Sequence, residues 1–239
     1  SVANSKKINE IYRTNDAMLG RLYRYVTLLL GMKPGQHEYK VMGLAPYGQA
    51  YHGMKSLKHF EKFNIIKGTK IFKKKYFKDV YYSTRNELHG ERFDGIAWGL
   101  QTFTENFLKK WSINCINKFK LKNLILSGGV AQNIKAIKFL QDDSRIKSVW
   151  SGPISGDGSL SIGAAWLASK TYDFKSKIMG INNIYLGSDI PNKNIDKIIK
   201  KKFNKFKCIK NVSNKQIARW ISKGLIVARC KGRMEFGQR

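Results

Sequence analysis

Two glycine-rich turns hold the residues of this chain best suited to bind an anionic or nucleotide ligand. The first turn, Gly128-Gly129, separates an apolar segment at 123–126 from a predicted helix at 131–140. Adjacent glycines let backbone amides approach a ligand closely, and the partial positive charge of a helix N-terminus points at the same place. Asn133, in the first turn of that helix, could hydrogen-bond the polar groups of a nucleotide. A tight structural turn followed by a surface asparagine is the alternative.

The second turn places a carboxylate between two glycines. Asp157 lies between Gly156 and Gly158, directly ahead of a predicted helix at 160–169. It could serve as the N-cap of that helix, or as a hard oxygen ligand for a metal ion that bridges phosphates. One carboxylate cannot hold a metal ion alone, and the four histidines of the chain show no paired helical spacing. We therefore expect any further ligands to lie outside this chain.

Two pairs of charged residues are further candidates. Glu38 and Lys40 lie two positions apart, so they share one face if the segment is extended, and could then bind ribose hydroxyls and a phosphate. An ordinary surface pair is the alternative. Arg233 and Arg239 follow a predicted apolar strand at 225–229 and bracket a glycine-containing turn. Two guanidinium groups so placed could bind phosphate or carbamate oxygens bidentately. A solvated strand end or a salt bridge with Glu235 is the alternative.

The order of the elements that must position these residues is that of an α/β protein. Apolar residues at helical spacing predict helices at 15–30 and at 94–119, the second with Asp94 as its N-cap. Predicted strands at 123–126 and 147–150 are each followed by a glycine-rich turn and a helix. We expect the two turns to lie at the tops of neighbouring strands and to face a common pocket.

Outside these units the pattern is weaker. Residues 55–82 alternate basic with aromatic or β-branched residues, which predicts short strands or a hairpin-like insertion. Apolar periodicity lapses from 171 to 180, and we interpret this segment as a linker. Beyond it we expect a lysine-rich helix at 192–206 and a helix at 214–222 capped by Ser213, ahead of the terminal apolar strand.

The formal net charge of +29 invites a nucleic-acid partner, because basic side chains neutralise phosphates. The excess is mostly lysine and is spread along the chain, without arginines or stacking aromatics arranged for base contacts. We interpret it as a solvated basic face and expect no nucleic-acid partner. No apolar run approaches the roughly 20 residues that span a bilayer, and no apolar signal segment is visible at the start, so we expect a cytoplasmic protein without membrane association.

Four motifs, in chain order, resemble landmarks of the carbamoyltransferase family of the NodU/CmcH type: HEYKVMGLAPYG, LSGGVAQN, PISGDGSLSIGAA and GRMEFGQR. That family joins an actin-like, sugar-kinase-like domain, termed ASKHA, to a C-terminal domain similar to YrdC. The resemblance implies that residues 1–170 are the C-terminal half of the ASKHA-type domain, that 171–180 are a linker, and that 181–239 are the incomplete start of the YrdC-like domain.

The resemblance also implies an activity. In such enzymes the C-terminal domain forms carbamoyl-adenylate from carbamoyl phosphate and ATP. The ASKHA-type domain then transfers the carbamoyl group to a hydroxyl of a small-molecule, sugar or natural-product acceptor. Because carbamoyl-adenylate is a mixed anhydride that water hydrolyses, the transfer needs a closed cavity that excludes water. The expected ligands are therefore ATP with Mg²⁺, carbamoyl phosphate, a divalent metal and a hydroxyl-bearing acceptor.

The same resemblance assigns roles to individual residues. Those assigned to holding the adenylate are Gly128, Gly129 and Asn133. Asp157 is assigned as a ligand of an iron-like divalent metal, and Arg233 and Arg239 belong to the carbamoyl-phosphate region.

The chain departs from the family pattern near its end, where Gln238 replaces a proline and the motif stops at Arg239. We interpret the chain as a fragment that is inactive alone, and a homodimer or a complementing fragment remains open as a protein partner. One alternative is a tRNA threonylcarbamoyl-transfer protein with the same core, a family that lacks the MGLAPYG and GRMEFG stretches. Two more are a non-catalytic basic binding module and a sugar kinase of the same superfamily, for which Asp157 is the only candidate for a catalytic aspartate.

Overall fold

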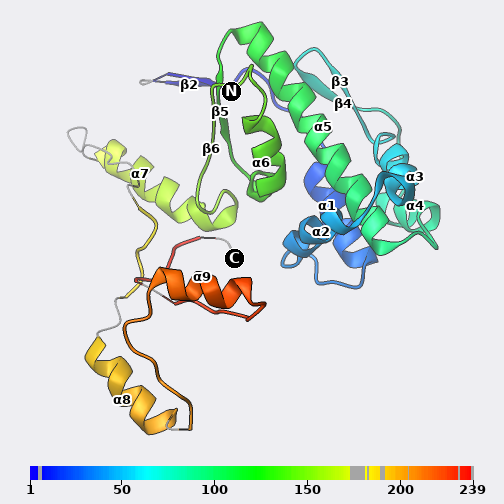
Figure 1. The fold of residues 1–239 in the computed structure, drawn as a ribbon. Coiled ribbons are helices and arrows are strands. Elements are labelled where there is room, and N and C mark those ends of the chain that lie inside the picture. The colour runs from blue at the N-terminus through cyan, green and yellow to red at the C-terminus, as the bar shows by residue number, and fades with distance from the viewer. Residues whose placement is uncertain are drawn as a thin grey trace. The chain divides into compact units, whose positions relative to one another are not determined.

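A helix of 27 residues, α5 (Phe93–Phe119), runs through the first of two compact units in this computed structural model (Figure 1). Its apolar stripe is buried, with Leu100 fully inaccessible and Ile96 at 2% exposure. The predicted helix at 94–119 is confirmed, but Asp94 is not its N-cap. The helix begins one residue earlier, and the Asp94 carboxylate instead accepts hydrogen bonds of 3.0 and 2.7 Å from the Arg92 guanidinium.

The structure describes residues 1–4, 7–172, 181, 183–188, 192–203, 205–230 and 232–237. The two compact units are Ser1–Ala164 and Ala165–Arg239, and each is described by itself. Within the described residues, no helix combines the length and the apolar character needed to cross a membrane.

Helix α3 (Ala50–Phe60) packs against α5 at very short range because glycines line the contact. A methyl group at Gly53 would lie 2.2 Å from the indole of Trp98. A methyl group at Gly95 would lie 2.4 Å from the carbonyl oxygen of His52, and one at Gly99 would lie 2.7 Å from the amide nitrogen of Leu57. The backbones of α3 and α5 are therefore closer together than a residue larger than glycine at these positions would allow.

Several N-terminal helices pack around α5. Helix α1 (Leu19–Leu29) contacts α5, α2 (Glu38–Leu44) and α4 (Val80–Glu87), and a short 3₁₀ helix, η1 (Ala45–Tyr47), continues α2. The predicted helix at 15–30 is thus present but begins at Leu19. Two short antiparallel strands, β1 (Val2–Ala3) and β2 (Ile8–Asn9), precede it.

Strands β3 (Asn64–Lys67) and β4 (Lys70–Lys73) form an antiparallel hairpin with Lys67 opposite Lys70. This confirms the hairpin expected within 55–82. The same stretch was not expected to be helical, yet it contains the C-terminal half of α3 and the first residues of α4. Asp79 caps α4 by accepting a hydrogen bond of 2.9 Å from the Tyr82 amide.

The α/β part of the first unit is a parallel pair of strands, β5 (Asn123–Leu126) and β6 (Ser148–Ser151). Strand β5 leads through the 3₁₀ helix η2 (Gly129–Gln132) into α6 (Ile134–Gln141), and β6 leads through η3 (Asp157–Ser159) into α7 (Leu160–Tyr172). Both predicted strand, turn and helix units are confirmed. One face of the pair packs against the core, whereas the other exposes Ile125 at 69% and Trp150 at 58%.

The second unit contains helices α8 (Asn192–Lys202) and α9 (Asn214–Ser222). Ser213 caps α9 as predicted, by accepting a hydrogen bond of 3.2 Å from the Gln216 amide. The strand expected at 225–229 is absent from the described residues, because this segment has no partner strand with which to exchange backbone hydrogen bonds. Most of the expected linker, residues 173–180, lies outside the described residues.

Candidate functional site

The two glycine-rich turns meet at one edge of the β5–β6 sheet. Because the strands run parallel, their carboxyl ends lie at the same edge. The Gly128 N–H donates a hydrogen bond of 2.6 Å to the Ser155 carbonyl oxygen. A methyl group at Gly156 would lie 3.0 Å from the side-chain Nε2 of Gln132 and 3.8 Å from the Cα of Gly129. The prediction that the turns lie together at the tops of neighbouring strands is confirmed.

The first turn presents its backbone to solvent. Gly128 has a φ of 94°, which side-chain-bearing residues rarely adopt. A Cβ added at Gly128 or Gly129 would meet nothing within 4 Å. In the described part of the chain, the N–H groups of Gly129 and Val130 have no hydrogen-bond partner. These amides at the start of η2 can therefore bind an anion.

Serine hydroxyls connect the two turns. The Ser151 Oγ, at the end of β6, donates a hydrogen bond of 2.9 Å to the Ala131 carbonyl of the first turn. It also shares a hydrogen bond with the Ser155 hydroxyl, which lies 3.0 Å from the Gly152 carbonyl. The sequence analysis missed these serines because nothing in their spacing marks them.

Asn133 lies at the N-cap of α6, not in its first turn as predicted, because the chain first completes the η2 turn. Its Oδ1 accepts a hydrogen bond of 3.0 Å from the Ala136 amide. Its Nδ2 donates to the Tyr23 hydroxyl and to Gln101 Oε1, both at 3.0 Å. The side chain is therefore buried, at 7% exposure, with protein partners for both of its ends. Adenylate binding by Asn133 stays a prediction, and direct contact would require one of these partners to be exchanged.

A buried polar network thus holds the first turn from the core side. Gln101, on α5, donates to Asn133 Oδ1 at 3.1 Å and to Glu105 at 2.7 Å, and it accepts a hydrogen bond from the Tyr23 hydroxyl. Burial raises the pKa of Tyr23 more than its hydrogen bonds lower it, so the phenol is neutral near pH 7. Tyr23 and Gln101 are polar residues on otherwise apolar helix faces, which is the sequence signal that could have identified them.

Asp157 opens η3, next to the first turn, and its side chain is exposed. In the described residues its carboxylate makes no hydrogen bond or ion pair, so it does not cap a helix. Across those residues, no three His, Cys, Asp or Glu side chains lie together as a metal site would need. Asp157 can therefore supply one ligand of a metal ion, and its role as a metal ligand stays a prediction.

Glu38 and Lys40 lie on helix α2, so the extended segment on which their shared face depended is not present. Residues two apart on a helix point about 200° apart, so these side chains do not share a face. Glu38 Oε1 accepts a hydrogen bond of 2.5 Å from the Gly35 amide, which stabilises the turn before the helix. The Lys40 ammonium lies 6.0 Å from the centre of the Tyr39 ring. Binding of a ribose or phosphate by either residue stays a prediction.

A family profile described as "Carbamoyltransferase N-terminus" matches residues 3–166, which include both glycine-rich turns and the Asn133 network. The chain belongs to the carbamoyltransferase family. The match covers most of the first compact unit and stops within α7.

Curated relatives of this carbamoyltransferase-family chain extend the similarity beyond the profile. The uncharacterized protein MJ1051 of Methanocaldococcus jannaschii is 31% identical over 255 residues, covering 100% of this chain and 47% of the relative. The uncharacterized protein sll1178 of Synechocystis is 29% identical, covering 92% and 40%. The nodulation protein NolNO of Sinorhizobium fredii is 24% identical, covering 92% and 33%. The chain thus spans less than half the length of the relatives it matches.

The arginines predicted for the carbamoyl-phosphate region lie beyond the family match. Arg233 belongs to the second unit, where its Nε donates a hydrogen bond of 2.6 Å to the Gly187 carbonyl and its Nη2 one of 3.3 Å to the Leu186 carbonyl. These bonds tie the segment around Arg233 to the segment around Gly187, where the Gly187 amide also donates to the Met234 carbonyl at 3.0 Å. Arg239 lies outside the described residues, so the predicted arginine pair stays a prediction.

Proposed function

We propose that this chain is part of an ATP-dependent O-carbamoyltransferase. The enzyme would form carbamoyl-adenylate from carbamoyl phosphate and ATP and pass the carbamoyl group to a hydroxyl of a small-molecule acceptor. Family membership supports carbamoyl transfer. The observation that favours an adenylate as the carrier is the meeting of two glycine-rich turns at the edge of β5 and β6, with free amides and an open space beside Gly128 and Gly129.

In this proposal the first turn binds the phosphate of the adenylate. The N–H groups of Gly129 and Val130, which have no partner among the described residues, lie at the start of η2, where helix geometry leaves donors unpaired. The Gly128 amide is already bonded to Ser155 and positions the second turn instead. Asn133, held by Tyr23 and Gln101, fixes the end of the turn. These residues bind and orient the ligand before the acceptor hydroxyl attacks the carbamoyl carbon and AMP leaves.

The remaining predicted residues are given roles by the same proposal. Asp157 would provide one oxygen ligand to a divalent metal that neutralises phosphate charge, with its other ligands outside the described residues. Arg233 and Arg239 would bind oxygens of carbamoyl phosphate, for which Arg233 would have to leave the Gly187 carbonyl. An ASKHA-type first unit and a YrdC-like second unit are part of the proposal.

A single methyl group tests the adenylate site. Gly129 is exposed, has an ordinary φ, and has open space around a Cβ, so Gly129→Ala should fold normally. The added methyl would, however, stand where the ligand approaches the backbone. We expect Gly129→Ala to weaken AMP or ATP binding to the chain at least tenfold in isothermal titration calorimetry, with an unchanged Tm.

Gly163→Ala on α7 is the matched control, because a Cβ there also meets nothing within 4 Å. It should bind nucleotide as the unsubstituted chain does. If Gly129→Ala and Gly163→Ala bind nucleotide with equal affinity, the first turn is not part of the adenylate site. If the unsubstituted chain binds no adenine nucleotide, the proposed ATP dependence is wrong.

A further inference from the structure

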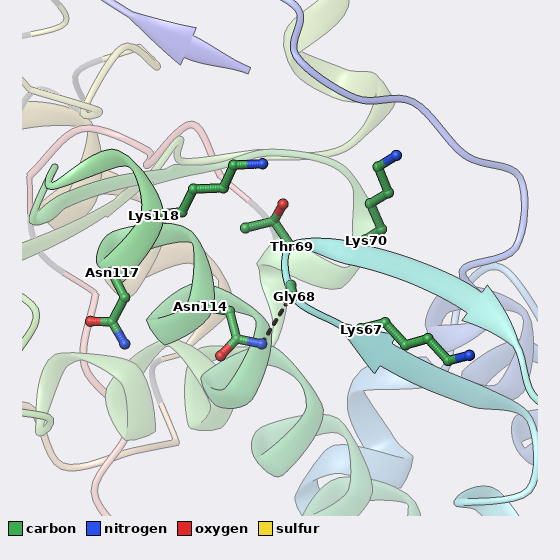
Figure 2. A pocket seen from close by; sticks show the side chains of 7 residues that line it. All are labelled: Lys67, Gly68, Thr69, Lys70, Asn114, Asn117 and Lys118. Carbon is green, nitrogen blue, oxygen red and sulfur yellow. Dashed lines mark hydrogen bonds between the residues drawn. The ribbon is translucent and has the colours of Figure 1, made fainter.

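An open cavity of about 590 Å³ lies between the tip of the β3–β4 hairpin and the C-terminal half of α5 (Figure 2). The residues that line it are Lys67, Gly68, Thr69, Lys70, Asn114, Asn117 and Lys118. None of them is acidic. The cavity belongs to neither glycine-rich turn and contains none of the residues that the proposed function uses.

Two side chains of α5 hold the hairpin tip in place. Trp111 Nε1 donates a hydrogen bond of 2.9 Å to the Thr69 carbonyl, and Asn114 Nδ2 donates one of 2.7 Å to the Gly68 carbonyl. Gly68 has a φ of 57°, as the first central residue of a two-residue hairpin turn requires. Both carbonyls of the tip are therefore occupied. The tip presents the Lys70 ammonium and the Thr69 hydroxyl to the cavity as hydrogen-bond donors.

The lysines around this cavity have no acidic partners among the residues that the structure describes. Lys67, Lys70 and Lys118 are exposed, and no carboxylate of the described residues lies within 4.0 Å of their ammonium groups. Like charges that share a cavity repel one another, and an anion that binds among them relieves this repulsion.

A neighbouring cavity shows the contrast. It is also lined by basic residues, but Lys109 and Arg145 there contact the Asp143 carboxylate at 3.0 and 2.6 Å. Hydrogen bonds from the Arg145 guanidinium and the Lys109 ammonium hold the pKa of Asp143 well below its usual range, so the carboxylate stays charged. That cavity supplies its own counter-charge, whereas the cavity at the hairpin tip does not.

We propose that the cavity at the hairpin tip binds the phosphate group of a small phosphorylated ligand. In Figure 2 the side chains of Lys70, Thr69 and Lys118 extend to the same side of the tip, and Lys67 extends away from them. Two ammonium groups and a hydroxyl match the charge and the acceptor oxygens of a phosphate. The volume is that of a small-molecule site, and no aromatic side chain lines it on which a nucleic-acid base could stack.

Titration with inorganic pyrophosphate at constant ionic strength tests the site. In amide NMR spectra we expect saturable shifts at Gly68 and Thr69 with one-site binding. The signals of Gly68 and Thr69 report this cavity, and the signal of Gly129 reports the proposed adenylate site. The two proposals can therefore fail independently. The double variant Lys70→Ala with Lys118→Ala should raise the Kd about tenfold, since each exposed ion pair contributes up to about fivefold.

The matched control is Lys33→Ala with Lys58→Ala, which removes the same charge from exposed positions outside the cavity. It should change the Kd less than twofold. If both double variants lose the same amount of pyrophosphate affinity, binding depends only on net charge and the proposal is wrong. Chemical-shift changes spread over lysines elsewhere in the chain would also contradict a specific site. If the Lys70 and Lys118 variant is unstable, Thr69→Val, which removes one hydroxyl from a surface turn, should still raise the Kd.

A single-stranded ten-nucleotide RNA is the second probe. If it binds more tightly than pyrophosphate in 150 mM salt and depends on the same two lysines, the surface recognises a nucleic-acid backbone and the small-ligand assignment is overturned.

Discussion

His59 is a titratable side chain buried in the core of the first unit, at 1% exposure. Its ring lies between Phe60 and Phe63, with centroid distances of 5.5 and 5.1 Å, and its Nε2 lies 3.1 Å from the Thr84 hydroxyl. Among the described residues Nδ1 has no hydrogen-bond partner. Burial lowers the pKa of His59 to about 4, against the opposing effect of Glu87, so the ring is neutral in the folded chain near pH 7.

This depressed pKa makes stability depend on pH. Above about pH 6.5 the ring is neutral in both states. Between there and pH 4 the unfolded chain binds a proton that the folded chain does not, so stability falls as the pH falls. We expect a loss of up to about 3 kcal/mol in the free energy of unfolding between pH 7 and pH 4 from this residue. His59→Phe should flatten that dependence in urea denaturation.

The control for exchanging a histidine for a phenylalanine is His89→Phe, at an exposed position. Carboxylates act at lower pH: Arg92 holds the pKa of Asp94 at about 2, so that contribution is lost only as the pH falls below about 4. The same slope between pH 7 and pH 4 in His59→Phe as in the unsubstituted chain would contradict the prediction.

The candidate site shows which residue positions a sequence can predict. The placement of Gly128 and Gly129 in a turn between a strand and a helix was predictable, because adjacent glycines interrupt both kinds of element. The partners of Asn133 were not, since Tyr23 and Gln101 are distant in sequence and meet only when α1 and α5 pack. Asn133 itself was predicted as a surface or ligand-binding residue, and burial in a polar network was not considered.

Among the elements, the contact between α3 and α5 depends on glycine. The prediction is that Gly95→Ala lowers the free energy of unfolding by at least about 2 kcal/mol, because its methyl group would lie 2.4 Å from a backbone carbonyl oxygen that cannot move aside alone. Urea denaturation measures the loss.

Gly43→Ala on α2 is the comparison. A Cβ there meets nothing within 4 Å, and replacing glycine by alanine in a helix gains up to about 1 kcal/mol. A Gly95→Ala variant as stable as Gly43→Ala would mean that the two helices can separate at no cost.

The spacing of large apolar residues decided which elements could be predicted from the sequence and which were missed. Strand β5 and helix α5 carry large apolar residues at regular spacing, so their bounds were close to those observed. Helix α3 packs against α5 through Gly53 and Ser56, whose burial depends on their small size and is not marked by large apolar residues. Helix α2 contains Gly43 and is followed by Pro46, and no helix was predicted there.

At the scale of the whole molecule, the chain spans 47% of its relative from M. jannaschii and 33% of NolNO. We propose that forming the carbamoyl-adenylate needs parts of the relatives that this chain does not span. The purified chain should therefore release no pyrophosphate from ATP in a carbamoyl phosphate-dependent manner, while still binding nucleotide. Carbamoyl phosphate-dependent release above the level without protein would show that the chain is sufficient.

The hydrogen bond from the Gly128 amide to the Ser155 carbonyl has a consequence for how this region can change. Surface loops usually tolerate insertions and deletions. Here, one residue more or less between Ser151 and Ser155 would move the acceptor away from Gly128 and the Ser151 hydroxyl away from Ala131. The length of the second loop is therefore fixed by the first, and the two can only be redesigned together.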